Sequence, residues 1–128
     1  MATPTYDIIT VGGGLAGAAL AKAMAERDAR VLVLEQEITF KERLLGETLM
    51  PWGGAEARAL GLYDDLKSAV GHEVRWLDTY LGPVHFPLRD LVETTPSRTP
   101  FLSFHHPRMQ EQLLNAAATA GAEVHRGM

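Results

Sequence analysis

The chain has 128 residues, a formal net charge of −4, 46% hydrophobic residues, 22% charged residues and no cysteine. These ordinary globular proportions exclude a disordered or collagen-like chain, and the length is that of one small domain or of part of a larger one. The acidic balance argues against binding to a nucleic-acid backbone, and the absence of cysteine excludes a disulfide scaffold, a thiolate metal site and a thiol nucleophile.

A strand–helix–strand unit is predicted at residues 6–35. Residues 6–11 form a short apolar run rich in β-branched residues, which is typical of a strand buried on both faces. Residues 15–27 are dominated by strong helix formers, and residues 30–34 form a second apolar run that ends at Glu35. This order predicts a parallel βαβ unit with a right-handed crossover.

The middle of the chain shows a weaker pattern. Short elements are expected there, each bounded by glycine or proline: a loop at 37–43, helices at 55–60 and 62–70, strands at 74–81 and 84–88, and a loop at 91–100. The two strands are separated by the turn dipeptide Gly82-Pro83.

A regular pattern returns near the end of the chain. Pro107 suits the first turn of a helix, and apolar residues recur at helical spacing over 109–120 before Gly121. Residues 122–125 resemble a further strand. Because no repeat, low-complexity tract or linker divides the sequence, a single domain is expected over residues 1–128.

The turn after the first strand carries the chemistry, since Gly12-x-Gly14-x-x-Gly17 is a GxGxxG fingerprint. In this context the first glycine permits the sharp exit from the strand, the second lets a pyrophosphate approach the backbone, and the third lets the helix pack closely. Leu15 and Ala16 would lie over the phosphate through their backbone N–H groups at the helix N-terminus. The unit is therefore predicted to bind a dinucleotide.

Glu35 stands at the end of the second strand, eighteen residues after Gly17. Its carboxylate can accept hydrogen bonds from ribose hydroxyls, and it would repel a 2′-phosphate, which counts against NADP at this site. The fingerprint does not separate FAD from NAD. A glycine-rich turn beside a solvated glutamate is the alternative without a ligand.

Three segments of the chain resemble the FAD-dependent monooxygenase superfamily, which includes aromatic hydroxylases, flavin-dependent halogenases and geranylgeranyl reductases. They are the βαβ unit, the stretch from Arg43 to Pro51 with its GE-x-x-x-P pattern, and the arginine-led helix at 107–121 with the strand after it. The GE form of the middle segment is closer to the halogenase and reductase branches. The resemblance implies a partial α/β domain, a Rossmann-like FAD-binding fold with a parallel sheet.

The same resemblance implies roles for the fingerprint and for the end of the second strand. Gly12, Gly14 and Gly17 would hold the FAD pyrophosphate. Glu35 would bind the adenosine ribose, and Gln36 would lie at the adenine end.

Further cofactor contacts are implied in the other two segments. Arg43 would contact the flavin or its phosphate arm, and Arg108 would approach the phosphate or ribose region. Gly46, Glu47 and Thr48 would lie along the ribityl and ring portion. A solvated charge cluster, a surface helix residue and a loop carboxylate are the alternatives for Arg43, Arg108 and Glu47, respectively.

Other reactive side chains form no recognisable site. The five histidines have no HExxH spacing, so no metal site is expected. The serines lie in no GxSxG elbow, and no catalytic residue is identified. Trp52 and Trp76 are expected to be packing residues, although Trp52 is close enough in sequence to the GE segment to line a flavin pocket.

The leading hypothesis is the FAD-binding N-terminal part of a flavin-dependent oxidoreductase, a monooxygenase that uses NAD(P)H and oxygen on an organic substrate. The family completes its FAD site with a later Gly-Asp segment and a separate substrate sheet, so this chain is expected to be an inactive part of a longer enzyme. Its apolar sheet edges could pair with a second copy.

Two other functions stay open. One is a non-catalytic dinucleotide-binding module that needs a partner chain, and the other is an NAD-dependent dehydrogenase fragment, which the segments of Arg43 and Arg108 disfavour. Neither a signal peptide nor a membrane span is recognised in the sequence, and a cytoplasmic location is expected.

Overall fold

The computed structural model describes residues 4–43, 47–69 and 71–128, which divide into two units. The first unit comprises Met1–Leu45 and His106–Met128, and the second comprises Gly46–His105. The second unit is thus inserted in the sequence of the first. The expectation of one domain over the whole chain stays a prediction.

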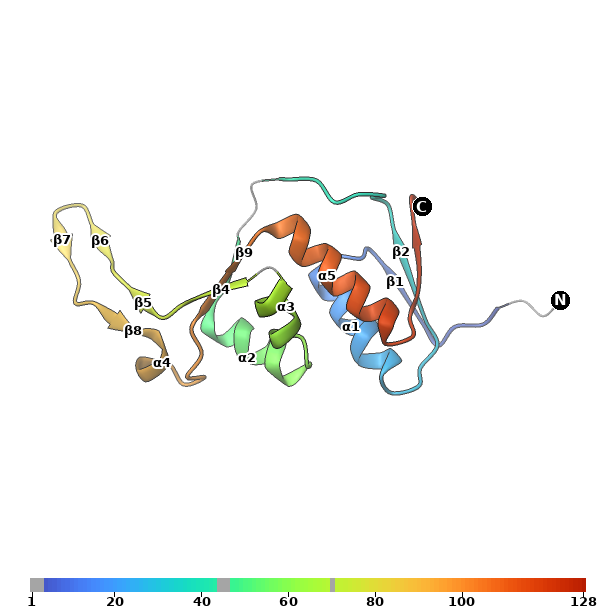
Figure 1. The fold of residues 1–128 in the computed structure, drawn as a ribbon, viewed down its shortest axis with the longest axis horizontal. Coiled ribbons are helices and arrows are strands. Elements are labelled where there is room, and N and C mark those ends of the chain that lie inside the picture. Colours follow the sequence, from blue (N-terminus) through green and yellow to red (C-terminus); the bar gives the residue numbers. More distant parts are fainter. Residues whose placement is uncertain (1–3, 44–46, 70) are drawn as a thin grey trace. The chain divides into compact units, whose positions relative to one another are not determined.

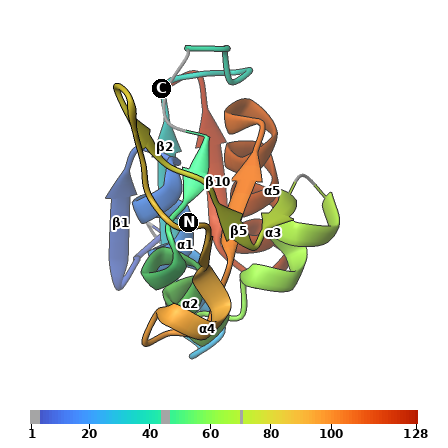
Figure 2. The same cartoon turned by 90° about the vertical axis from the view of Figure 1, so that its left-hand side faces the viewer.

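A three-stranded parallel sheet organises the first unit. Its strands are β1 (Ile8–Val11), β2 (Val31–Glu35) and β10 (Glu123–Arg126), and β2 lies between the other two (Figure 2). Val11 pairs with Leu34, and Arg126 pairs with Glu35, so the three strands end together at one edge of the sheet. This confirms the predicted βαβ unit and the Rossmann-like fold class.

Two helices cover one face of this sheet. Helices α1 (Leu15–Ala25) and α5 (His106–Thr119) lie side by side on that face and pack against each other (Figure 1). Small α1 side chains let α5 approach, and α5 presents an apolar stripe at helical spacing. The side chains buried in this layer include Ala18, Ala21, Val31, Val33, Met109, Leu113 and Ala117.

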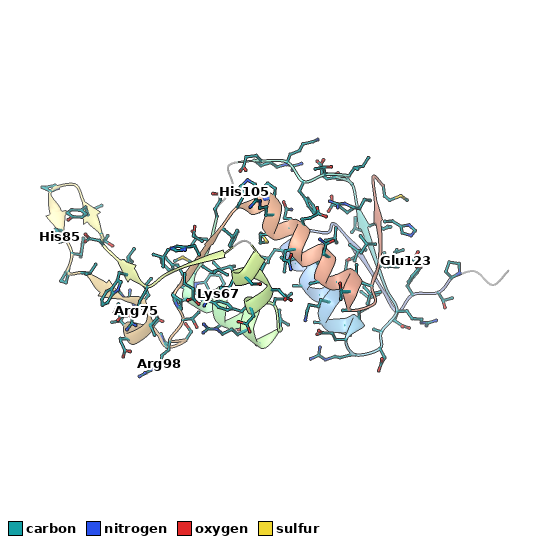
Figure 3. The ribbon with its side chains drawn as sticks, in the orientation of Figure 1. Lys67, Arg75, His85, Arg98, His105 and Glu123 are labelled. Atoms are coloured by element: carbon teal, nitrogen blue, oxygen red, sulfur yellow. The ribbon has the colours of Figure 1, made fainter. Side chains whose placement is uncertain are left out.

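The opposite face of the sheet keeps apolar side chains in contact with solvent. Ile9 and Val11 are 57% and 87% exposed, because alternate residues of a strand point to opposite faces and both helices pack on the other one. Ahead of β1, the Tyr6 hydroxyl donates to Glu123 Oε2 on β10 at 2.5 Å, and Glu123, which is labelled in Figure 3, also pairs with His125.

The second unit contains a small antiparallel sheet with strand order β3-β9-β4. Its strands are β3 (Thr48–Leu49), β9 (Phe101–Phe104) and β4 (Gly71–Val74), and helices α2 (Pro51–Ala59) and α3 (Tyr63–Ala69) belong to the same unit. Fully buried leucines form its core, and they are Leu62, Leu66, Leu91 and Leu102.

A β-ribbon extends from this small sheet. Strand β5 (Trp76–Leu77) pairs with β8 (Arg89–Asp90), and β6 (Tyr80–Leu81) pairs with β7 (Val84–His85) around a two-residue turn. Short helix α4 (Leu91–Thr94) follows the ribbon. Figure 3 shows Arg75 near the base of this ribbon and His85 towards its tip.

Several sequence predictions for the second unit are wrong. Helix α2 begins at Pro51 rather than at residue 55, because proline fits the first turn of a helix. Gly54 is helical because it packs in a crowded site, where a Cβ would lie 2.8 Å from Thr99 Cγ2. The expected loop at 91–100 contains α4, whose first turn is capped by the Asp90 carboxylate. Strand β9 was not predicted at all.

An ion pair joins the starts of β1 and β2. Asp7 Oδ2 accepts hydrogen bonds from the Arg30 backbone N at 2.9 Å and from Nε at 3.1 Å, and Asp7 Oδ1 accepts from Nη2 at 2.8 Å. These bonds stabilise the charged carboxylate and lower the pKa of Asp7 to about 2. They also raise the pKa of Arg30.

We therefore predict an acid-dependent contribution of Asp7 to stability. Because the folded-state pKa is depressed from 3.8 to about 2, this contribution is present above pH 4 and is lost as the pH falls towards 2. The Asp7→Asn variant should show a smaller fall in the free energy of unfolding across this interval, measured by urea titration at several pH values. Asp64→Asn is the control, and an identical slope for Asp7→Asn and wild type would contradict the prediction.

Candidate dinucleotide-binding site

The glycine loop between β1 and α1 has the geometry that its sequence predicts. Gly12 has a φ of +103°, a region that side chains other than glycine rarely adopt, and its N–H donates to the Leu34 carbonyl at 2.7 Å. A Cβ at Gly17 would lie only 2.0 Å from the Gly12 carbonyl oxygen. Glycine at position 17 is therefore required by the close approach of the helix to the loop.

At the N-terminus of α1, no side chain of the N-cap residue accepts a hydrogen bond from the backbone N–H groups of the first turn. Gly14 occupies the N-cap position, no side chain caps the helix, and no acidic residue lies in its first turn. The N–H groups of Leu15 and Ala16 have no carbonyl one turn earlier in the helix, so they can bind an anion. A Cβ at Gly14 would meet only Gln110 Nε2 at 3.8 Å, which leaves open space beside the loop.

The Glu35 carboxylate is hydrogen-bonded to the backbone of this glycine loop. It is only 5% exposed, its Oε2 accepts a hydrogen bond from Gly13 N at 2.6 Å, and its Oε1 accepts from Glu37 N at 2.8 Å. Each carboxylate oxygen carries two lone pairs and can accept a second bond. Glu35 is thus a buried part of the loop rather than a solvated strand end, and it keeps acceptor capacity for a ribose hydroxyl.

A cavity of about 500 Å³ lies in the first unit at the carboxyl ends of the parallel strands. This is the edge at which open α/β sheets bind ligands. Four predicted site residues line the cavity, namely Gly12, Glu35, Gln36 and Arg43. The other lining residues were missed by sequence reasoning, and they are Val11, Leu34, Glu37, Phe40, Lys41, His106, Gln110 and Met128.

The cavity wall formed by the residues after β2 carries three charged side chains, Glu37, Lys41 and Arg43. The Glu37 carboxylate lies 3.1 Å from Lys41 Nζ and 2.5 Å from Arg43 Nη2. The hydrogen bond from Lys41, together with the charges of both cations, lowers the pKa of Glu37. The sequence signals for this cluster are Glu37 and the alternating charges at 41–43, in a segment predicted to be a loop.

Arg126 of β10 links the segment after β2 to α5 through contacts with Glu37 and Glu111. It forms a two-pronged ion pair with Glu111 at 2.8 and 3.0 Å, and its Nε donates to the Glu37 carbonyl at 3.2 Å. Its guanidinium also lies 4.7 Å from the centre of the Phe40 ring. The segment after β2 is therefore anchored to β10 and α5 without helix or strand structure of its own.

Other predicted site residues do not line the cavity. Arg108 is exposed on α5, and Glu47 and Thr48 are exposed in the second unit, where Thr48 pairs with Ser103 of β9. Gly46 lies outside the described residues. Their cofactor roles stay predictions.

The described residues also include no group of three His, Cys, Asp or Glu side chains that could hold a metal ion. Within the same part of the chain, no helix is both long enough and apolar enough to span a bilayer.

The chain is similar in sequence to known proteins. Residues 10–40 match a family model described as an NAD(P)-binding Rossmann-like domain. The chain is 33% identical to the mitochondrial squalene epoxidase 2 of Arabidopsis thaliana over 113 residues, which cover 88% of this chain and 19% of that protein. The chain spans about one fifth of the length of the curated relatives that it matches.

Solved structures share the fold. The p-nitrophenol 4-monooxygenase PnpA of Pseudomonas putida superposes with a TM-score of 0.79 at 20% identity, covering 99% of this chain and 33% of PnpA. The myxobacterial FAD-dependent halogenase CndH superposes with a TM-score of 0.73 at 26% identity, covering 95% of this chain and 28% of CndH.

The two loop glycines should respond differently to alanine. We expect Gly17→Ala to lower the free energy of unfolding by roughly 2–4 kcal/mol, because its Cβ collides with backbone that cannot give way. Gly14→Ala should stay within about 1 kcal/mol of wild type, because the space is open and φ is negative. Denaturant titration measures both, and equal losses would contradict the loop geometry.

Proposed function

We propose that this chain, which resembles squalene epoxidases in sequence and shares the fold of monooxygenases and an FAD-dependent halogenase, binds FAD and supplies the cofactor-binding part of a flavin-dependent monooxygenase. The superfamily resemblance drawn from the sequence is confirmed by these matches. The observation that carries the proposal is the junction of the glycine loop, the Glu35 carboxylate and the cavity at the carboxyl edge of one parallel sheet.

The residues present fit a dinucleotide in shape and in charge. The open N-terminus of α1 beside Gly14 suits the diphosphate, and the remaining lone pairs of Glu35 suit the ribose hydroxyls. Gln36, at the cavity wall, would face the adenine end, and Arg43 would supply a cation to the phosphate arm. The buried carboxylate of Glu35 disfavours a 2′-phosphate at this position.

FAD, when bound, supplies the redox chemistry, and the residues of this chain bind and orient it. We propose NAD(P)H and an organic substrate as the other partners of the whole protein. Among monooxygenase reactions, epoxidation is the first to test, because the relatives at 33% identity are named squalene epoxidases. We further propose a cytoplasmic location, and association of copies through the outer edge of β1, which has no strand beside it among the described residues.

Two alternatives are separated from this proposal by ligand preference. An NAD-dependent dehydrogenase fragment would take up NADH and leave FAD unbound, and a non-catalytic module would bind its dinucleotide only with a partner chain. The direct experiment is titration of the purified protein with FAD and, separately, with NADH, followed by flavin fluorescence and calorimetry. Saturable one-to-one FAD binding supports the proposal, and tight NADH binding without flavin uptake would overturn it.

Gly14→Ala tests whether the glycine loop itself receives the cofactor. Its Cβ would occupy the space through which the diphosphate approaches the backbone, so we predict about tenfold or greater weakening of FAD binding. The fold should be unaffected, which separates this loss from unfolding. Thr119→Ala, an exposed change in the last turn of α5, is the control and should bind FAD as wild type does.

A further inference from the structure

Glu37 is the fixed member of the charge cluster on the cavity wall. Its N–H donates to Glu35 Oε1 at 2.8 Å, and its carbonyl accepts from Arg126 Nε at 3.2 Å, so its backbone is held from both sides. Its side chain is only 19% exposed. The fold therefore fixes the backbone of Glu37 and shields most of its side chain from solvent.

The two cations are the exposed members of the cluster. The side chains of Lys41 and Arg43 are 72% and 52% exposed, and the Glu37 carboxylate is the one partner that both of them share. A long, exposed side chain samples many rotamers unless a contact selects one. Glu37 provides that contact at the rim of the cavity, since all three residues line it.

The ion pairs leave donors available for a ligand. Arg43 uses only Nη2 towards Glu37, while a guanidinium carries five N–H donors. Lys41 uses one contact of an ammonium that has three donors. The Glu35 and Glu37 carboxylates balance the two cations over the cavity as a whole, so an anion would be received at the rim by the remaining donors of Lys41 and Arg43.

We propose that Glu37 is a positioning residue, which holds Lys41 and Arg43 so that their remaining donors meet a phosphate group in the cavity. The inference rests on the proposed function in taking that phosphate to be the diphosphate of FAD. Inorganic pyrophosphate offers the same chemistry without the nucleoside and flavin parts. The two ligands together therefore separate recognition of phosphate at this rim from recognition of FAD.

Loss of the Glu37 carboxylate changes the affinity for an anion in opposite directions through electrostatics and through positioning. Removing a carboxylate beside two cations raises the local positive potential, which by itself would tighten the binding of an anion. Loss of positioning weakens it instead, because the cations must be ordered again when the ligand binds. The direction of the change in affinity thus decides between the two effects.

The test compares Glu37→Gln with wild type by calorimetric titration of FAD and of inorganic pyrophosphate. Glutamine keeps the backbone contacts and the side-chain length, and thermal unfolding confirms that the variant is folded. We expect binding about threefold to fivefold weaker, the upper range for an exposed ion pair. Glu56→Gln, which removes an exposed carboxylate of α2 that does not line the cavity, is the control and should bind both ligands as wild type does.

Each outcome decides the proposal. Unchanged or tighter binding by Glu37→Gln overturns the positioning role while leaving FAD binding intact. If wild type binds pyrophosphate but not FAD, and Glu37→Gln weakens pyrophosphate binding, the positioning role stands and the proposed function fails. Wild type that binds neither ligand overturns both. In an Arg43→Ala background, Glu37→Gln should have a clearly smaller effect, because one positioned cation is already missing.

Discussion

A buried hydrogen bond from Gly13 N to the Glu35 carboxylate, 2.6 Å long, is the contact on which the site depends. It joins the loop after β1 to the end of β2, the central strand of the sheet. A Cβ at Gly13 would lie 3.0 Å from Leu114 Cδ1 and 3.1 Å from Glu35 Oε2, so α5 and β2 both close on this loop. Without the carboxylate, a buried N–H would lose its acceptor, at a cost of about 1–3 kcal/mol.

The same carboxylate links the loop to the charged wall of the cavity. Its second oxygen accepts from Glu37 N, and Arg126 holds the Glu37 carbonyl from the other side. A chain of contacts therefore runs from the backbone of the glycine loop to the cations at the rim. The contact at the glycine loop is made by the buried Glu35 side chain, whereas the cations at the rim, Lys41 and Arg43, have exposed side chains.

The sequence predicted those parts of the fold whose determinants are local. Residues 6–35 combine apolar strands, helix formers and a glycine turn, and the spacing of Met109, Leu113 and Ala117 is sufficient to identify the face of α5. Strand β9 is four residues long and is specified by its partners β3 and β4, which a local pattern does not contain. The role of Glu37 was missed for the same reason, since it depends on contacts with Glu35 and with the distant Arg126.

The central claim is that the glycine loop and the end of β2 together receive the dinucleotide. Amide chemical-shift mapping during an FAD titration of the isotope-labelled protein tests it most directly, because it reports binding residue by residue. We predict saturable shifts at Gly13, Gly14, Leu15 and Gln36, with smaller changes on the ribbon of β6 and β7. FAD binding that leaves these amides unmoved and shifts resonances elsewhere would contradict it.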